Sequence, residues 1–285
     1  MLPTASTLLL RQLRERSVNP YNERKEIIIV FTLVAWNEAR TAATTIAPVT
    51  GTDDDSVQVV GDDIIVPKFR HLIGQYAGHG VTAVAGTPSQ AYLDSPSLRR
   101  VTRNEIAKLH NFAVTPTPTL VGVFPRNPVP LDEGEALNAY LANTAVCANG
   151  RGMVGALLAD GAIAPVTGEI RTILCTSVIT GTLAVWDSGA LTLAYDLPAG
   201  RYQVVGARCL AGATAQLFRL IFPEQWHRPG GVSARVVTDP DLEVFRRGNL
   251  GVWGEMTHRV LPRLEVLNVE TVANPSIYLD IIKVA

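Results

Sequence analysis

The chain is a succession of short apolar runs rich in β-branched and aromatic residues, separated by clusters of Gly, Pro and Asp. Runs of this length between turn residues are typical of β-strands joined by short connections. The alternating strand and helix patterns of a parallel α/β sheet are absent from the sequence. We therefore expect an all-β fold of antiparallel sheets. The expected strands are 26–36, 42–49, 56–60, 63–66, 68–76, 81–85, 119–124, 153–159, 169–179, 182–186, 190–196, 201–210, 214–222, 232–237, 263–271 and 276–284.

A connecting region separates two strand-rich stretches. Residues 97–109 have an apolar spacing that suits a short helix or an ordered connection, and a Pro-rich extended segment follows. Asp132 is placed to cap a second helix over 133–141. Each strand-rich stretch exceeds the length of about 100 residues that a β-sandwich needs. We divide the chain into an N-terminal arm (1–26), a first β-sandwich half with the helical and Pro-rich connector (27–148) and a second β-sandwich half (149–285).

Two turns can be predicted in the second half. Gly189 ends the triplet 187–189 and supplies the left-handed residue of a three-residue hairpin loop. Pro and Gly in 197–200 predict a tight turn, so we expect the flanking strands to form an antiparallel meander. The segment 197–206 also loosely echoes 66–74, and each is a turn followed by a strand.

Composition limits the classes of function. Only 18% of the residues are charged, against about 25% in an ordinary soluble domain. A surface with so few charges is typical of a subunit that a partner partly covers. The 25 Lys and Arg against 26 Asp and Glu give a net charge of −1, which excludes a uniformly basic nucleic-acid-binding protein. The longest apolar stretch, 27–36, is too short to cross a bilayer as a helix.

Motifs that carry chemistry are missing from the sequence. The five His form no zinc or iron pattern, and neither a nucleophile elbow nor a phosphate-binding glycine loop occurs. We therefore expect no enzymatic activity, no cofactor and no metal. The acidic residues within 53–63 lack the spacing of a calcium loop, and whether they bind a cation stays open. The three Cys have no paired spacing, so we expect buried thiols in a reducing compartment.

Three segments carry residues suited to protein contacts. The loop 222–231 places Trp226, His227 and Arg228 between two prolines, and Trp and Arg are frequent in interface hot spots. The alternative is a loop packed on its own domain. The segment 245–255 combines two arginines with a tryptophan and is a candidate contact for phosphate or for a carboxylate of a neighbouring subunit, with a surface turn that has one buried Trp as the alternative. The basic arm has a short amphipathic pattern, with a frayed terminus as its alternative. The candidate interface residues are Leu10, Arg11, Leu13, Arg14, Trp226, His227, Arg228, Arg246, Arg247 and Trp253.

Residues 150–285 resemble the jelly-roll major capsid proteins of icosahedral, tailless phage-like viruses. The resemblance lies in the succession of 197–206, 215–223, 226–230, 249–255, 262–267 and 274–282 rather than in one diagnostic motif. It implies a jelly-roll fold for these residues. For the whole chain we expect two tandem jelly-roll-like halves with a short helical connector, and a single jelly roll is the alternative. The resemblance also implies a structural role without catalytic residues.

The expected function is that of a major capsid subunit of a bacteriophage-like virus, made in the host cytoplasm and assembled into the virion. The main partner is then the chain itself, with other capsid or internal virion proteins as further candidates. A weak contact of the arm with the genome or an inner membrane is another candidate, and no small-molecule substrate is expected. The alternative from a different class is a ligand- or carbohydrate-binding β-sandwich module, for which Trp186 and Tyr195 are the candidate aromatic surface.

Overall fold

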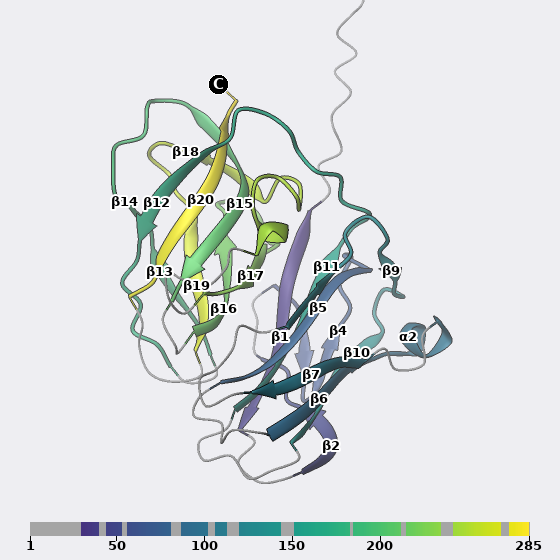
Figure 1. Ribbon diagram of the computed structural model, residues 1–285. Coiled ribbons are helices and arrows are strands. Elements are labelled where there is room, and N and C mark those ends of the chain that lie inside the picture. The colour runs from purple at the N-terminus through teal and green to yellow at the C-terminus, as the bar shows by residue number, and fades with distance from the viewer. Residues whose placement is uncertain are drawn as a thin grey trace, which may run out of the picture.

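The computed structural model describes residues 30–39, 44–52, 56–80, 87–101, 106–112, 120–143, 151–182, 185–211, 215–234, 242–268 and 274–284. In these residues the chain is almost entirely β-structure, and every pairing between strands is antiparallel (Figure 1). The strands form four sheets that make up two sandwich-like halves. The expected all-β, antiparallel fold is therefore confirmed.

Two sheets build the N-terminal half. In sheet 1 the order is β1 (Phe31–Ala39), β11 (Arg151–Ala159), β5 (His71–Gly80) and β8 (Leu120–Val123), and β9 (Val129–Pro130) also pairs with β5. In sheet 2 the order is β3 (Val59–Val60), β4 (Asp63–Ile65), β10 (Ala136–Asn143), β6 (Thr87–Asp94) and β7 (Ile106–Phe112), and β2 (Thr44–Val49) pairs with β10 beside β4. A short helix, α2 (Pro96–Val101), connects β6 to β7.

Two further sheets build the C-terminal half. In sheet 3 the order is β14 (Thr192–Leu193), β12 (Arg171–Thr176), β20 (Ser276–Lys283), β15 (Arg201–Leu210) and β18 (Gly254–Thr257). In sheet 4 the order is β13 (Trp186–Ala190), β19 (Arg263–Asn268), β16 (Ala215–Ile221) and β17 (Gly230–Val232). A 3-10 turn, η1 (Glu243–Phe245), precedes β18.

The two halves share one strand order. Sheet 1 runs β1-β11-β5-β8 and sheet 3 repeats it as β12-β20-β15-β18, so each half pairs its first strand with its last. Sheet 2 contains β2-β10-β6-β7 and sheet 4 repeats this order as β13-β19-β16-β17. The similar segments 66–74 and 197–206 lead into β5 and β15, which have equivalent positions in the shared strand order of sheets 1 and 3.

The equivalent strands β5 and β15 carry the same irregularity. Between paired neighbours, Ile73 in β5 and Val205 in β15 have no partner on the adjacent strand, so each forms a β-bulge. A glycine follows each bulge, Gly74 and Gly206. A Cβ on Gly206 would lie 2.8 Å from the carbonyl oxygen of Phe245, so only glycine allows η1 to approach β15 this closely.

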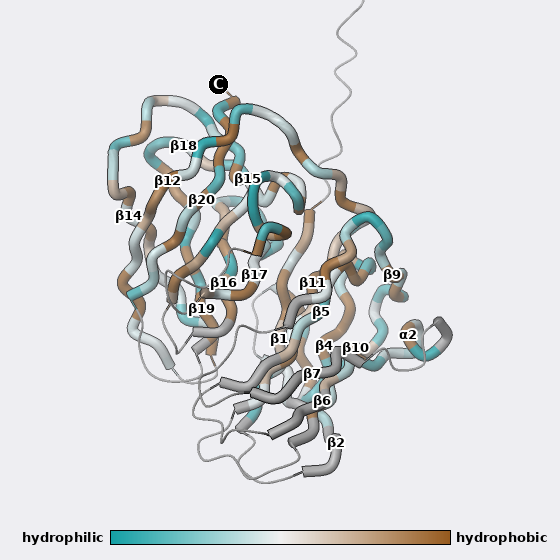
Figure 2. Tube along the Cα trace, in the orientation of Figure 1, coloured by the Kyte–Doolittle hydropathy of each residue, from teal (hydrophilic) through white to brown (hydrophobic). Residues whose placement is uncertain are grey.

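Sheet 1 is buried on both faces, which accounts for the unbroken apolar character of β1. Val34 and Trp36 belong to the core between sheets 1 and 2, whereas Phe31, Leu33 and Ala35 belong to a core shared with the C-terminal half. The hydrophobic stretches in Figure 2 follow these strands. The same alternation runs along β11, which lies between β1 and β5. The expected division at residue 149 would separate β11 from both neighbours.

Two local predictions were wrong. The expected helix 133–141 is strand β10, because Leu137, Ala139 and Leu141 alternate into the core with a period of two. The expected hairpin turn at 187–189 lies inside β13, and Gly189 is there because a Cβ would meet the Ser177 side chain at 2.3 Å.

The expected meander is also wrong, because β13 lies in sheet 4 while β14 and β15 lie on opposite sides of β12 and β20 in sheet 3. Within 97–109, α2 accounts for the first part of the expected short helix and β7 for the last part. The arm, 1–26, and the expected strand 81–85 lie outside the described residues.

Candidate assembly interface

The predicted contact loop between β16 and β17 lies at the junction of the two halves. Trp226 stacks on Phe69 of the N-terminal half, with ring centroids 4.3 Å apart and planes 16° from parallel. Trp226 is nonetheless 48% exposed. The side chain therefore joins the two halves and still presents an apolar surface to the outside.

His227 points inward from the same loop. It is buried, its Nε2 lies 3.2 Å from the carbonyl oxygen of Trp253, and its ring packs edge-on against Phe69. Burial lowers the pKa of His227, and the Trp253 carbonyl and the charge of Asp160 only partly offset this effect. A neutral imidazole is thus built into the junction.

Arg228 belongs to a buried ionic cluster. Its Nη1 donates to both carboxylate oxygens of Glu265, at 2.9 and 3.0 Å, and Glu265 also accepts from Nε of the fully buried Arg219. The guanidinium of Arg219 lies 4.0 Å above the ring of Trp186. Burial of such ions is costly unless each is paired, so the cluster fixes the geometry of sheet 4.

The ionic cluster reaches across to sheet 1. Arg219 Nη1 donates to the carbonyl oxygen of Leu33 at 3.3 Å, and the amide of Leu33 donates to the carbonyl oxygen of Arg228 at 2.9 Å. The amide of Arg228 donates to the hydroxyl of Thr32. The edge of β1 is therefore covered by the loop before β17 rather than open to another strand.

The two arginines after η1 are held by one carboxylate. Arg246 donates from Nε and Nη2 to the two oxygens of the fully buried Asp280, at 2.7 and 2.9 Å, and the backbone amide of Arg247 donates to Asp280 at 2.9 Å. Burial alone would raise the pKa of Asp280, but the hydrogen bonds from Arg246, Thr172 and Arg247 lower it below its ordinary value. Arg246 thus anchors the loop to sheet 3, whereas the side chain of Arg247 is exposed.

Trp253 is a core residue. It is fully buried, meets Phe31 edge-to-face with centroids 5.3 Å apart, and stacks near Phe218 at 6.3 Å. A neighbouring copy cannot reach this side chain. Trp253 therefore joins the two halves of the subunit and does not contact a neighbouring copy.

The predicted contact residues thus separate into two groups. His227 and Arg228 are committed to contacts within the subunit, as the alternative of a loop packed on its own domain states. Trp253 is buried, as the alternative of a surface turn with one buried Trp states, and Arg246 is held by Asp280. Trp226 and Arg247 keep exposed surface. Leu10, Arg11, Leu13 and Arg14 lie outside the described residues.

Sequence reasoning missed the acidic partners Glu265 and Asp280, and Arg219. Each is a charged residue inside a strongly apolar strand, which is a signal of a buried ion pair. The sequence does not show which strands bring the partners together, because Arg219 and Glu265 are 46 residues apart.

The alternative aromatic surface is not assembled. Trp186 is buried under Arg219 in sheet 4, whereas Tyr195 follows β14 of sheet 3 and is 84% exposed. In the described part of the chain, no group of three His, Cys, Asp or Glu side chains is close enough to hold a metal ion. The same residues include no helix with the length and apolarity to cross a membrane.

The cysteines that the structure describes behave as expected for buried thiols. Cys175 and Cys209 are both free and both buried. Burial raises the pKa of Cys175 to about 11 and that of Cys209 further still. Neither is suited to act as a nucleophile near neutral pH.

No protein-family model, no curated protein and no solved structure matches the chain.

Proposed function

We propose that the protein is a structural capsid subunit with two tandem jelly rolls that assembles with copies of itself into an icosahedral shell. The observation that carries this proposal is the strand order, which is the same in both halves. In a jelly roll, two facing sheets place the first strand beside the last and the second beside the penultimate, and each half contains this order of four strands in each of its two sheets. Viral capsid proteins are among the proteins built on this sandwich.

The repetition within one chain supports assembly into closed rings. Three copies of a chain with two equivalent sandwiches place six similar units around one axis. Closed cyclic arrangements are the usual outcome when a subunit meets copies of itself. We therefore propose a trimer as the building block of the shell.

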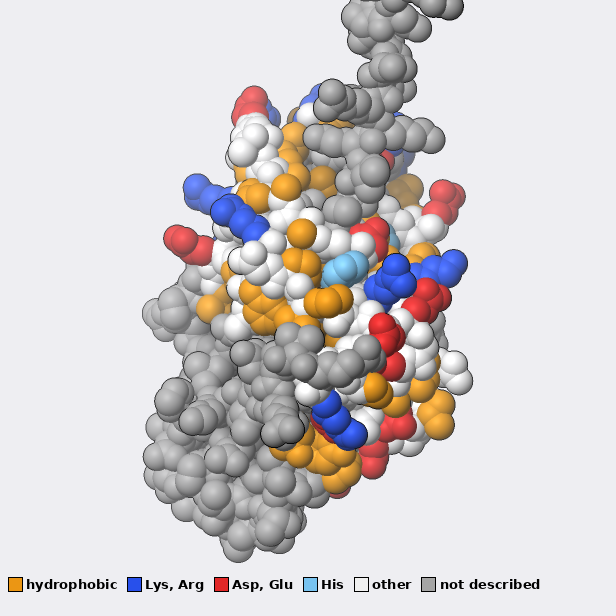
Figure 3. All heavy atoms as spheres, turned by 90° about the vertical axis from the view of Figure 1, so that its right-hand side faces the viewer, with side chains coloured by type: hydrophobic (Ala, Val, Ile, Leu, Met, Phe, Trp, Pro, Cys, Tyr) orange, Lys and Arg blue, Asp and Glu red, His pale blue; other side chains and the backbone are white. Residues whose placement is uncertain are grey.

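The surface of the subunit supports contacts with copies of itself. On the face drawn in Figure 3, hydrophobic side chains form patches among scattered acidic and basic ones. Trp226, Val178 and Tyr195 are among the large hydrophobic side chains that are exposed in the described part of the chain. A low charged fraction agrees with interfaces whose buried centres are depleted of charge.

The first experiment measures the mass of the full chain in solution. Light scattering over a range of concentrations is expected to give a particle three times the 30.7 kDa of the chain or a larger assembly, and negative-stain microscopy is expected to show rings or shells. A chain that stays monomeric at high concentration would overturn the proposal.

Two variants then test the junction loop in assembly. Trp226→Ala removes the exposed indole, whereas Phe69→Leu removes the ring beneath it and leaves the indole in place. If Trp226 contacts a neighbouring copy, Trp226→Ala lowers the assembled fraction more than Phe69→Leu does. If the two variants lower the assembled fraction equally, Trp226 contacts only residues of its own subunit.

A further inference from the structure

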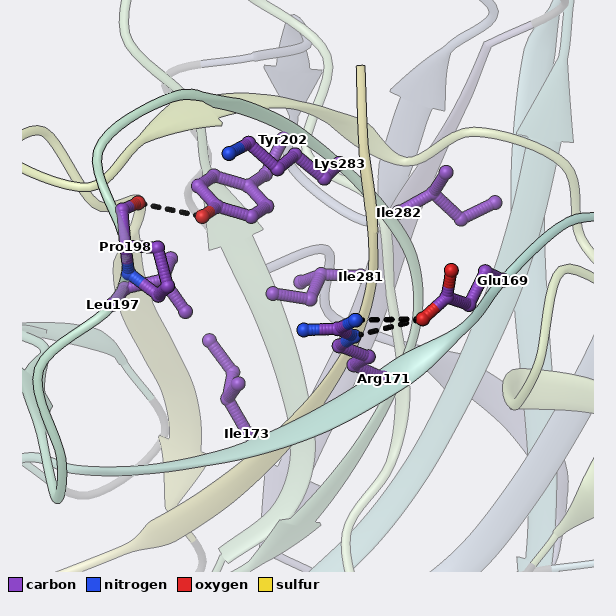
Figure 4. Close-up of a pocket in the computed structure, with 9 residues that line it drawn as sticks. All are labelled: Glu169, Arg171, Ile173, Leu197, Pro198, Tyr202, Ile281, Ile282 and Lys283. Carbon is purple, nitrogen blue, oxygen red and sulfur yellow. Dashed lines mark hydrogen bonds and ion pairs between the residues drawn. The ribbon is translucent and has the colours of Figure 1, made fainter. Parts of the chain in front are cut away.

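A hollow lies at the end of the C-terminal sandwich, on the inner face of sheet 3. Its volume is about 400 Å³, within the usual range of small-molecule pockets, and it is drawn in Figure 4. Ile173, Leu197 and Ile281 contribute apolar surface to it, and Arg171, Lys283 and Glu169 contribute charged groups. The residues come from β12, β20 and the connections before β12 and β15.

The strand register explains why cations lie beside apolar core residues here. Arg171 is opposite Ile281, and Tyr202 is opposite Lys283. Residues directly opposite each other in neighbouring strands point to the same face of a sheet. Since Ile281 and Tyr202 belong to the core cluster, Arg171 and Lys283 lie on the core-facing side of sheet 3, at the mouth of the sandwich, where their side chains are exposed to solvent.

The charges of the hollow do not balance. Arg171 donates from Nε and Nη2 to one oxygen of Glu169, at 3.2 and 2.6 Å, as the dashed lines in Figure 4 show. The third guanidinium nitrogen, Nη1, points away from Glu169 and toward the space between Ile173 and Ile281. With Lys283 as a second cation, two positive groups and one carboxylate surround an apolar floor.

We propose that this hollow binds a small amphiphile with an anionic head group, namely a carboxylate with a hydrocarbon tail of medium length. The tail lies on the apolar floor, because burial of each CH₂ group contributes about 0.8 kcal/mol. The carboxylate is bound by Nη1 of Arg171, in a charge-assisted pair that gives direction to the head group, and Lys283 adds a second positive charge to the hollow. The site does not depend on the proposed shell, because all of its residues belong to one chain.

The test is calorimetric titration of the full chain with octanoate, below the concentration at which it forms micelles. Acetate carries the head group alone, and octanol carries the tail alone. Octanoate is expected to bind at least tenfold more tightly than either, because the hollow offers partners to both parts. Equal affinity for octanoate and octanol, or no measurable binding of octanoate, would overturn the proposal.

Variants of the two paired residues provide opposite expectations. Arg171→Gln is expected to weaken octanoate binding at least fivefold, since it removes the directed cation. Glu169→Gln is expected to strengthen binding, since it removes the carboxylate that competes for Arg171. Because the two changes move the affinity in opposite directions, loss of folding in one variant leaves the other decisive.

The matched control is Arg201→Gln. Arg201, the residue before Tyr202, lies outside the hollow and forms a surface ion pair with Glu255. Octanoate binding to this variant is expected to equal that of the parent protein. If Arg171→Gln and Arg201→Gln reduce the affinity equally, the effect comes from net charge and the proposed site is wrong.

Discussion

At the scale of the residue, the strongest constraint at the junction is the single carboxylate of Glu265 between two guanidinium groups. Its side chain is 6% exposed, and its partners Arg219 and Arg228 are 0% and 12% exposed. Removing one partner of a buried ion pair lowers stability far more than replacing both partners by apolar residues, because an uncompensated charge stays buried. The stability of the junction therefore depends on Glu265 more than on any exposed ion pair.

Glu265→Gln is predicted to lower the free energy of unfolding by roughly 3 to 5 kcal/mol, since it removes the buried negative charge that pairs with Arg219 and Arg228. Denaturant titration followed by tryptophan fluorescence measures the change. Glu255→Gln, which breaks the exposed pair with Arg201, is the control and is expected to cost less than about 1 kcal/mol. Similar losses in the two variants would contradict the account of the buried cluster.

At the scale of the element, the loop between β16 and β17 connects stability to pH through His227. The folded protein holds this imidazole neutral, because burial lowers the pKa of His227 below its ordinary value. The unfolded chain takes up the proton at the ordinary pKa of about 6.5, so it binds more protons than the folded state as the pH falls below that value. The contribution of His227 to stability is therefore complete above about pH 6.5 and declines toward the lower pKa of the folded state.

The prediction is that the unfolding free energy falls less between pH 7.5 and pH 5 in His227→Gln than in the parent protein. A glutamine amide can still donate to the Trp253 carbonyl, so the hydrogen bond is kept while the titration is removed. His258→Gln is the matched control; His258 follows β18 and accepts a hydrogen bond from the Gly200 amide. A pH dependence unchanged in His227→Gln would refute the assignment.

The elements also show what sequence patterns can and cannot predict. Strands such as β15 and β20 were predicted within a residue or two, because an apolar period of two between turn residues is local information. At β10 a helix was predicted instead of a strand, because Leu137, Tyr140 and Leu141 also have a helical spacing. At Gly189 a turn was predicted instead of a strand, because the sequence does not distinguish a glycine needed for close packing from one needed for a turn.

The candidate site was harder to predict than the strands for a physical reason. The sequence marks Trp226, His227 and Arg228 as unusual, but the contacts that decide their roles come from Phe69, Glu265 and Asp160, which lie far away in the chain. Assignment to the inside or outside of the subunit depends on these long-range pairings. Only the three-dimensional arrangement supplies them.

At the scale of the whole molecule, the two halves share a core although they repeat one strand order. The outer face of sheet 1 contributes Phe31, Leu33 and Met153 to the same cluster as Trp253 and Phe218 of the C-terminal half. Separating the halves would expose this face and would leave Arg219 without the Leu33 carbonyl. Halves joined only by a linker would lack such an interface, and interfaces between domains of one chain are usually more polar than this one.

The shared core predicts that the subunit unfolds in one step. Differential scanning calorimetry of the unassembled chain is expected to show a single transition whose calorimetric and van't Hoff enthalpies agree, because neither half retains its full core after the other unfolds. Phe31→Ala, which removes the ring against Trp253, is expected to lower the midpoint of that transition by weakening both halves at once. The control is Leu137→Ala, which creates its cavity in the core between sheets 1 and 2 and away from the junction. If the halves are coupled as the packing indicates, both variants keep one transition. Two separate transitions in the parent protein, with Leu137→Ala shifting only one of them, would show that the halves fold independently and that the junction contributes little to their stability.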